Sequence, residues 1–132
     1  MKTVEPSPER LQAFANAALQ GPIVMLNLLR YREQAEYPQG YGAEPCSGRE
    51  AYHRYGEVVV ARIATVGGEL VWMGSAQFSV IAPAGEEWDD VVLVRYPSRE
   101  AFLEMVAQPE YIAATPHRTA ALEDSRLVVT TE

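Results

Sequence analysis

The chain has 132 residues, of which 48% are hydrophobic and 22% are charged, and its formal net charge is −7. These values are typical of one globular domain, and the negative charge argues against a nucleic-acid partner, whose phosphates it would repel. No apolar run approaches the roughly 20 residues that cross a bilayer, and no signal-peptide segment follows Met1. We therefore expect a single domain over residues 1–132, located in the cytoplasm, with no membrane partner.

The first predicted elements are a helix over residues 7–20 and a strand over residues 23–30. Ser7 and Pro8 are a typical helix start, with a hydroxyl N-cap and a proline at the first helical position. The strand is apolar on both faces except at Asn27. Because a buried amide needs hydrogen-bond partners, Asn27 is either a satisfied structural residue or a polar group aimed into a pocket.

Residues 31–48 have no hydrophobic period. The segment holds three tyrosines, beginning with Tyr31, together with two prolines and three glycines. Structureless loops of this length are uncommon in compact domains, and the aromatic residues argue against plain disorder. We predict a flap-like loop or a dimer-contact arm. Cys46 is the only cysteine; with no base placed beside it, we expect a small loop residue and not a nucleophile.

A second helix is predicted from Ser47 or Gly48 to a Gly-Gly pair at 67–68. Tyr55 belongs to its apolar stripe, which recurs at helical spacing. His53 and Glu57 lie one turn apart on a neighbouring face, close enough to hydrogen-bond. They form either a solvated surface pair or a pair for acid/base chemistry.

A long strand is predicted over residues 69–81. Its alternation places Leu70 and Trp72 on one face and Val71 and Met73 on the other. A glycine in the middle of this strand, at position 74, indicates a bulge or a close approach of another group to the backbone.

A further strand is predicted over residues 91–96, where Arg95 is the second polar residue in an apolar strand. Ser98 is the expected N-cap of the helix that follows. The Gln-Pro-Glu triplet at 108–110 should break this helix and start a short one that carries Tyr111.

Near the end of the chain, Pro116 is expected to kink the short helix. His117 and Arg118 follow it directly. The chain is then expected to close with a strand over residues 127–130.

After the first helix, the order strand, helix, strand, strand, helix, strand is that of the ferredoxin-like arrangement. We predict an α+β fold, βαββαβ, with a four-stranded antiparallel sheet covered by helices on one face and an extra N-terminal helix. The first and third strands are expected to be central neighbours that run parallel. Asn27 and Arg95 would then share one face, with Arg95 as an anchor for an anion or a carbonyl.

The face of the sheet without helices also needs cover, because large exposed apolar surfaces are uncommon on monomers. A second copy is the simplest cover, by two-fold symmetry. We therefore expect a homodimer formed by sheet-to-sheet packing.

Five pieces of the chain, in this order and spacing, carry a family resemblance: Ala51–Tyr55, Gly67-Gly68, Val94–Ser98, Pro109–Tyr111 and Asp124–Val128. From about Gly48 onward the chain resembles the domain-of-unknown-function family 1330 of the dimeric α/β-barrel superfamily. The resemblance implies a ferredoxin-like fold and a dimer. Relatives in that superfamily include cofactor-free monooxygenases, lactone isomerases, dehydratases and haem-binding enzymes, with ligands in a cleft between sheet and helices or near the dimer interface.

Three functions remain open from the sequence, so whether the protein is an enzyme is undecided. The first is a cofactor-free enzyme, of monooxygenase or isomerase type, that acts on a small aromatic or carbonyl metabolite. The second is a non-catalytic ligand-binding or sensor domain that uses the same cleft. The third is a dimeric structural module in which Asn27 and Arg95 satisfy each other.

The candidate catalytic residues are Arg95, Asn27, His53 and His117. The candidate ligand contacts are Tyr55, Trp72, Tyr111, Arg118 and Tyr31. We expect no cofactor and no metal, because the sequence has no P-loop, GxGxxG, GxSxG, CxxC or HExxH motif. Haem ligation by His117 is not expected either, since an isolated histidine beside an arginine is more typical of a helix C-terminus.

Overall fold

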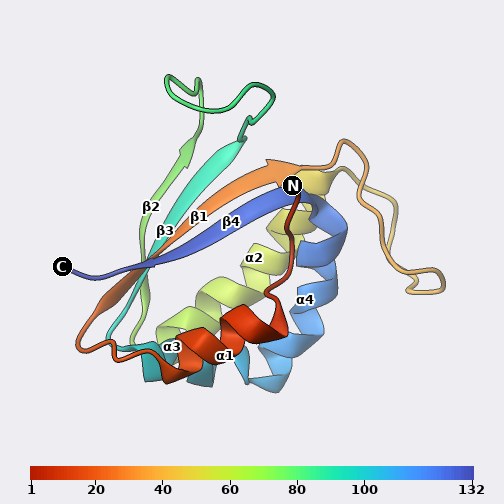
Figure 1. Ribbon diagram of the computed structural model, residues 1–132. Helices are drawn as coiled ribbons and strands as arrows, with labels where there is room; N and C mark the ends of the chain where they lie inside the picture. Colours follow the sequence, from red (N-terminus) through yellow and green to blue (C-terminus); the bar gives the residue numbers. More distant parts are fainter.

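One antiparallel sheet and the helices on one of its faces make up the computed structural model, which describes residues 1–132 (Figure 1). In chain order the elements are α1 (Pro8–Asn16), β1 (Ile23–Tyr31), α2 (Gly48–Thr65), β2 (Glu69–Ser75), β3 (Asp90–Tyr96), α3 (Arg99–Val106), α4 (Pro109–Ala121) and β4 (Leu122–Thr130). The strand order is β2-β3-β1-β4. The predicted α+β, ferredoxin-like fold is confirmed. No helix is both long and apolar enough to span a membrane.

The two central strands, β1 and β3, are neighbours as predicted, but they run antiparallel. The reason is the number of chain reversals between them. The α2 crossover returns the chain so that β2 runs in the direction of β1, and the next connection reverses the chain again into β3. The expectation of parallel central strands is therefore wrong.

The register of β1 and β3 also separates the two polar residues of these strands. Asn27 lies opposite Val92, whereas Arg95 lies opposite Val24. Residues directly opposite each other share a face, and the pair Asn27 and Val92 is on the side of the buried Met25, which faces the helices. Arg95 therefore faces the other, open side. The predicted pairing of Asn27 with Arg95 on one face is wrong.

Strand β2 contains an irregularity that changes which side chains share a face. Its register against β3 shifts between Leu70 and Trp72, so Val71 is an extra residue. Leu70 and Met73 consequently face the helix side and Trp72 faces the open side. The predicted common face of Leu70 and Trp72 is wrong. The close approach expected at Gly74 is confirmed, because a Cβ there would lie 2.8 Å from the Trp72 indole nitrogen.

The chain between β2 and β3, residues 76–89, projects beyond the end of the sheet (Figure 1). We call it the arm. The predicted strand over 69–81 therefore ends early, at Ser75, because no other strand lies beside residues 76–81. The apolar residues of the arm are almost fully exposed: Phe78 at 85%, Val80 at 85% and Ile81 at 96%.

Helix α1 ends at Asn16, four residues before the predicted end at 20. Its Phe14 ring meets the edge of Phe102 in α3 at 5.5 Å between centroids. Arg99 of α3 also donates a hydrogen bond to the Ala17 carbonyl, just past the helix end. These contacts attach the added N-terminal helix to α3.

Helix α4 runs through Pro116 to Ala121 without interruption. A proline lacks the N–H that would bond the carbonyl four residues earlier, here Ile112. The Thr115 hydroxyl donates to that carbonyl at 2.7 Å instead. β4 follows directly at Leu122, five residues before the predicted strand start.

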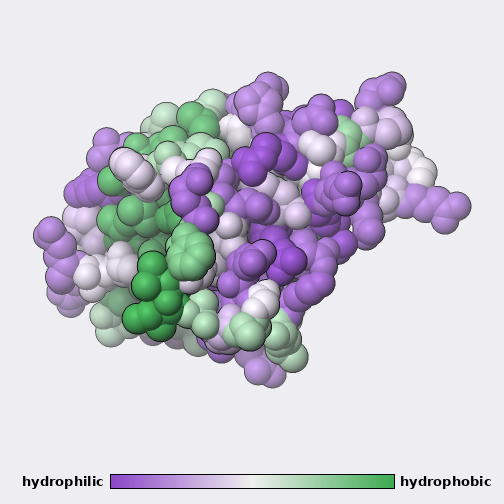
Figure 2. All heavy atoms as spheres, turned by 90° about the horizontal axis from the view of Figure 1, so that it is seen from above, coloured by the Kyte–Doolittle hydropathy of each residue, from purple (hydrophilic) through white to green (hydrophobic).

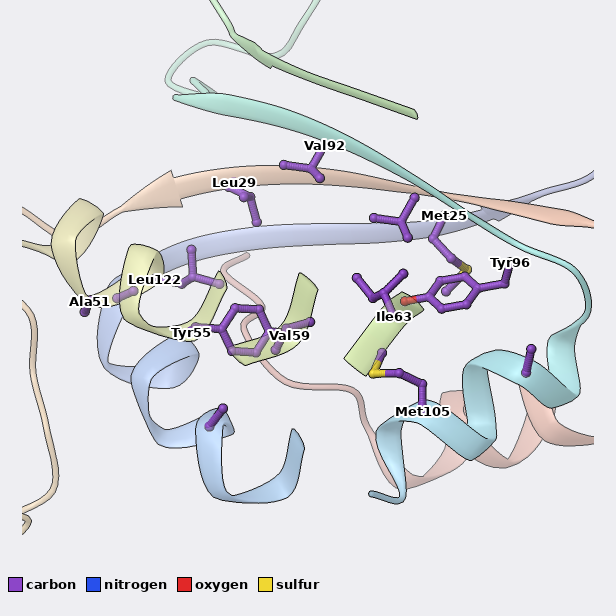
Figure 3. Packing of buried hydrophobic residues seen from close by; sticks show 14 of the residues in the cluster. Met25, Leu29, Ala51, Tyr55, Val59, Ile63, Val92, Tyr96, Met105 and Leu122 are labelled. Carbon is purple, nitrogen blue, oxygen red and sulfur yellow. The ribbon is translucent and has the colours of Figure 1, made fainter. Parts of the chain in front are cut away.

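The core lies between the sheet and the helices (Figure 3). Its largest fully buried side chains come from both layers: Ile23, Leu29, Met105 and Leu122. The helix-facing side of the sheet is thus filled mainly by aliphatic groups, with Asn27, Asp90 and several tyrosines as polar residues among them.

Candidate functional site

Four tyrosines enter the layer between sheet and helices, and we call them the phenol cluster: Tyr52 and Tyr55 from α2, Tyr96 from β3 and Tyr111 from α4. Tyr52 and Tyr55 lie one turn apart on α2, which brings their rings close. Tyr96 lies on the same face of β3 as the buried Val92 and Val94 and so points to the helices. α2 and α4 therefore contribute three tyrosines in ring contact, whereas the ring of Tyr96 packs against Phe102, with 5.2 Å between centroids.

The cluster is joined by one direct hydrogen bond. The Tyr55 hydroxyl donates to the Tyr111 hydroxyl at 3.1 Å, and their rings are 6.0 Å apart. The Tyr52 and Tyr55 rings are 5.2 Å apart. Tyr96 directs its hydroxyl into the layer (Figure 3), and neither it nor Tyr52 has a side-chain hydrogen bond within the chain. Two of the four hydroxyls therefore remain free.

Burial keeps these phenols neutral. It raises the pKa of Tyr52 to about 12, and it raises the pKa of Tyr55 and Tyr96 well above the ordinary range of tyrosine. The neighbouring phenols raise all three values further, whereas the positive charge of Arg118 acts in the opposite direction on Tyr52 and Tyr55. At neutral pH these three groups can therefore donate hydrogen bonds, but they cannot act as bases.

Arg118 lies two turns after Tyr111 on α4, on the same side of the helix. Its Nη1 donates to the carbonyl of Val4 at 2.5 Å. It is half-buried and takes part in none of the ion pairs of the protein. The cluster thus has a cationic neighbour without an acidic partner.

A second polar group lies beside the cluster at the end of β1. The Tyr31 hydroxyl donates to Asp90 Oδ2 at 2.6 Å, and Arg49 donates to the same oxygen at 3.0 Å. Asp90 is 4% exposed, so both partners compensate a buried charge. The Tyr31 ring lies 5.5 Å from that of Tyr52. Tyr31 therefore supports one wall of the cluster, with its hydroxyl already occupied.

The flap, residues 32–47, is attached to the ends of α4 and β1. The Arg32 N–H donates to the Ala121 carbonyl at 2.8 Å, and the Glu36 N–H donates to the Ala120 carbonyl at 3.0 Å. Cys46 of the flap is 8% exposed and packs with the core. The predicted flap-like loop is therefore folded against the helices.

His117 fastens the flap and does not enter the phenol cluster. Its Nδ1 lies 2.7 Å from the Tyr37 hydroxyl, and Arg54 donates to that hydroxyl at 3.2 Å. Because arginine only donates, the phenol proton is directed to Nδ1, which must be unprotonated. Burial and the charge of Arg54 lower the pKa of His117, in agreement with a neutral ring.

The remaining predicted site residues lie elsewhere. Asn27 faces the helices, and its amide donates to the carbonyls of Val92 at 3.2 Å and Met25 at 3.5 Å, the satisfied arrangement. Arg95 and Trp72 face the open side of the sheet.

His53 is the last of these residues. Its Nε2 pairs with Glu57 at 3.0 Å, and its side chain is 77% exposed, the solvated alternative for this pair. No group of three or more His, Cys, Asp or Glu side chains is placed to hold a metal ion.

Of the predicted residues, the fold thus brings together Tyr55, Tyr111 and Arg118, with Tyr31 beside them. Sequence reasoning missed Tyr52 and Tyr96 as site residues. A signal for both was present, because each occupies a position in an otherwise apolar stripe or face. Tyrosine at such positions places a hydroxyl in a core.

The fold and sheet order define a ferredoxin-like α+β protein. Residues 46–131 match the family described as Domain of unknown function (DUF1330), and the chain belongs to this family. The resemblance inferred from the sequence is confirmed. No curated protein matches the chain significantly.

Solved structures similar to the chain include the following three. The RPA0582 protein of unknown function from Rhodopseudomonas palustris is 39% identical, with a TM-score of 0.91 over 100% of this chain and 98% of that one. A dimeric protein of unknown function from Bacteroides fragilis, with a ferredoxin-like fold, is 16% identical, with a TM-score of 0.53 over 86% and 98%. SnoaB, a cofactor-independent oxygenase from Streptomyces nogalater, is 15% identical, with a TM-score of 0.52 over 86% and 94%.

Proposed function

We propose that the protein binds a small aromatic or carbonyl-bearing metabolite at the phenol cluster, between the sheet and the helices. The observation that carries this proposal is the set of hydroxyls inside an otherwise apolar layer, of which Tyr52 and Tyr96 have no side-chain partner. Neither hydroxyl oxygen is among the fully buried polar atoms that lack a partner, so both reach solvent-accessible space. A ligand carbonyl or hydroxyl could accept hydrogen bonds from these two neutral phenols.

The shape of the cluster supports an aromatic ligand. Neighbouring rings of Tyr31, Tyr52, Tyr55 and Tyr111 lie 5.2 to 6.0 Å apart in tilted and edge-on arrangements. These rings contact one another and together form an apolar aromatic surface, on which the free hydroxyls would fix the orientation of a ligand. Apolar walls with a few convergent donors are the usual composition of a small-molecule site.

A second candidate is a cofactor-free enzyme of monooxygenase or isomerase type at the same place. Neutral phenols directed at one point would stabilise an oxyanion as it develops on a carbonyl. SnoaB, named a cofactor-independent oxygenase, has a similar fold. The cluster contains donors but no imidazole, since His117 binds the flap and His53 is at the surface. We therefore rank binding without turnover first.

We also propose that two copies pack through their open sheet faces. Trp72 and Val128, on that face, are 60% and 50% exposed, and the arm adds nearly bare apolar side chains. Figure 2 shows hydrophobic atoms gathered on the side of the molecule away from the flap. The similar protein from Bacteroides fragilis is described as dimeric. A second copy would cover these surfaces.

Titration calorimetry with neutral aromatic carbonyl compounds, such as acetophenone, benzamide and salicylaldehyde, tests the binding proposal. We expect saturable binding of at least one compound, weakened about 2- to 10-fold when Tyr55 and Tyr111 are both replaced by Phe, since a hydrogen bond contributes about 0.5–1.5 kcal/mol. Tyr41→Phe is the matched control, because Tyr41 lies in the flap. The proposal is wrong if no compound binds, or if the control weakens binding as much as the double variant.

A further inference from the structure

We infer that the ligand of the phenol cluster is an anion, a carboxylate or an enolate, and that Arg118 is the group that recognises its charge. This inference rests on the proposed function and adds the substrate class to it. The phenol hydroxyls by themselves suit a neutral carbonyl compound as well as an anion, so the preference for an anion depends on Arg118. Three properties of Arg118 carry the inference: its lack of an acidic partner, its unused donors and its position beside the hydroxyls.

Arg118 differs from the other basic residues in its surroundings. Most basic side chains are neutralised by a carboxylate: Lys2, Arg32, Arg49, Arg62, Arg99 and Arg126. Arg30 and Arg95 lie on the open face of the sheet, Arg54 is bound to Tyr37, and Arg10 is exposed on α1. Arg118 is therefore the guanidinium without an acidic partner next to the phenol cluster.

The guanidinium of Arg118 has N–H donors that form no hydrogen bond within the protein. Arginine carries five N–H groups, and the structure uses one side-chain nitrogen, Nη1, which bonds the Val4 carbonyl. No nitrogen of Arg118 is among the buried polar atoms that lack a partner. The remaining donors are thus not sealed in the core. A planar fork of this kind matches a carboxylate with two parallel hydrogen bonds.

The position of Arg118 connects it to the hydroxyls. Tyr111, Ala114 and Arg118 follow one another along one side of α4, and Ala114 between them is 3% exposed. The Arg118 charge also lowers the pKa of Tyr52 and Tyr55, against the larger effect of burial. The side chains of Tyr111 and Arg118 therefore leave α4 on the same side, and one anionic ligand along that side could accept from both.

Neither Arg118 nor the tyrosines of the phenol cluster form a hydrogen bond with an acidic side chain. Asp90, the buried carboxylate nearby, is already engaged by Tyr31 and Arg49. The chain as a whole carries a net charge of −7, which would repel an anion at long range. The half-buried Arg118, which has no acidic partner, provides the local attraction that an anionic ligand needs.

The alternative role of Arg118 is to fasten the N-terminal strap, residues 1–5, through the Val4 carbonyl. The strap has its own attachments to β4, because the Thr3 N–H donates to Asp124 at 2.9 Å and the Thr3 hydroxyl donates to the Ser125 carbonyl at 2.6 Å. The strap can therefore be loosened by Thr3→Val while Arg118 stays intact. This variant separates the two roles.

The test compares carboxylates with their neutral amides of the same shape: benzoate with benzamide, phenylacetate with phenylacetamide, and 4-hydroxybenzoate with 4-hydroxybenzamide. Calorimetry on the full chain should give at least one carboxylate that binds tenfold or more tightly than its amide. Arg118→Gln should remove this preference and leave amide affinity within threefold of the original. Thr3→Val should keep the preference.

The outcomes are distinguishable. If amides bind as tightly as carboxylates, and the Tyr55→Phe, Tyr111→Phe double variant weakens both, the anion inference is wrong and the proposed function stands. If no compound of either kind binds, both are wrong. A carboxylate preference that survives Arg118→Gln, or that is lost in Thr3→Val, overturns the role of Arg118.

If Arg118→Gln does not fold, Arg118→Met takes its place, with the same expected loss of preference. If neither variant folds, Arg118 is a structural residue and its assignment is overturned.

Discussion

Two glycines of α2 have opposite spatial requirements. A Cβ at Gly48 would lie 2.2 Å from the Arg32 carbonyl oxygen and 2.6 Å from that of Ala121. At Gly56 no atom lies within 4 Å of the corresponding position. Gly48 is thus the point where the flap, α2 and the end of α4 meet, and it admits no side chain.

We predict that Gly48→Ala lowers the free energy of unfolding by about 1–3 kcal/mol, because two backbone carbonyls must move. Gly56→Ala should raise it by about 0.5–1 kcal/mol, because alanine is the better residue inside a helix. Urea unfolding of both variants measures these changes. A Gly48→Ala protein as stable as the Gly56→Ala protein would contradict the packing described at the flap base.

The contact between His117 and the flap predicts a dependence of stability on pH. The pKa of His117 is lowered in the folded protein, so below the ordinary value of about 6.5 the unfolded chain binds more protons. Stability from this group is therefore present above that value and is lost as pH falls towards the lower, folded pKa. We expect the melting temperature to fall between pH 7.5 and 5.5, and to fall less in His117→Gln.

The second histidine provides the control for this pH experiment. His53 is exposed and pairs only with Glu57, so His53→Gln should keep the pH dependence that His117→Gln reduces. Equal pH profiles for the wild-type protein and His117→Gln would show that the ring does not hold the flap as a neutral acceptor.

At the scale of single elements, the local sequence predicts where the helices start. Ser7, Ser47 and Ser98 cap α1, α2 and α3 with their side-chain oxygens, as the sequence predicts, and Ser47 forms a complete capping box with Glu50. A cap depends on residues within one turn of each other. Such features are predictable because all the interacting groups are neighbours in the chain.

Strand ends and registers are different, since they depend on distant partners. Residues 76–81 alternate like a strand, but the sheet offers them no neighbour and β2 ends at Ser75. Likewise, the residues near Asn27 in the sequence do not predict that it lies opposite Val92. This register places Asn27 and Arg95 on different faces of the sheet. The proposed pairing failed for this reason, whereas Tyr55 and Tyr111 were found from residue type and helical face.

Helix α4 gives a prediction at this scale. The Thr115 hydroxyl bonds the Ile112 carbonyl, which Pro116 cannot reach. We expect Thr115→Val to cost about 0.5–1.5 kcal/mol, because this variant keeps the shape and removes the hydrogen bond. Thr115→Ser should retain most of the stability. Chemical denaturation measures both, and equal losses in the two variants would show that the hydroxyl does not stabilise the helix.

On the scale of the whole molecule, apolar exposure is concentrated on the side of the sheet and the arm (Figure 2). If two copies pack there, Trp72→Glu should raise the dimer dissociation constant at least about tenfold, because buried tryptophans are common hot spots. Val60→Glu on α2 is the control, since Val60 is 57% exposed and Trp72 60%. Light scattering should report more monomer for the first variant only.

The whole molecule also separates two groups of tyrosines. The phenol cluster lies between the sheet and the helices, whereas Tyr37 and Tyr41 stack on each other in the flap, with centroids 5.3 Å apart, beside His117. The first group is proposed to meet the ligand and the second to hold the flap. A ligand at the cluster should therefore affect one group directly and leave the other unchanged.

The most direct measurement of the ligand site is ¹³C NMR of protein labelled at the tyrosine Cζ carbons, each resonance assigned by Tyr→Phe substitution, during addition of benzoate and acetophenone. We expect saturable shifts at Tyr52, Tyr55, Tyr96 and Tyr111, with Tyr41 unchanged. No shift in the cluster, or a shift confined to the flap tyrosines, would contradict it.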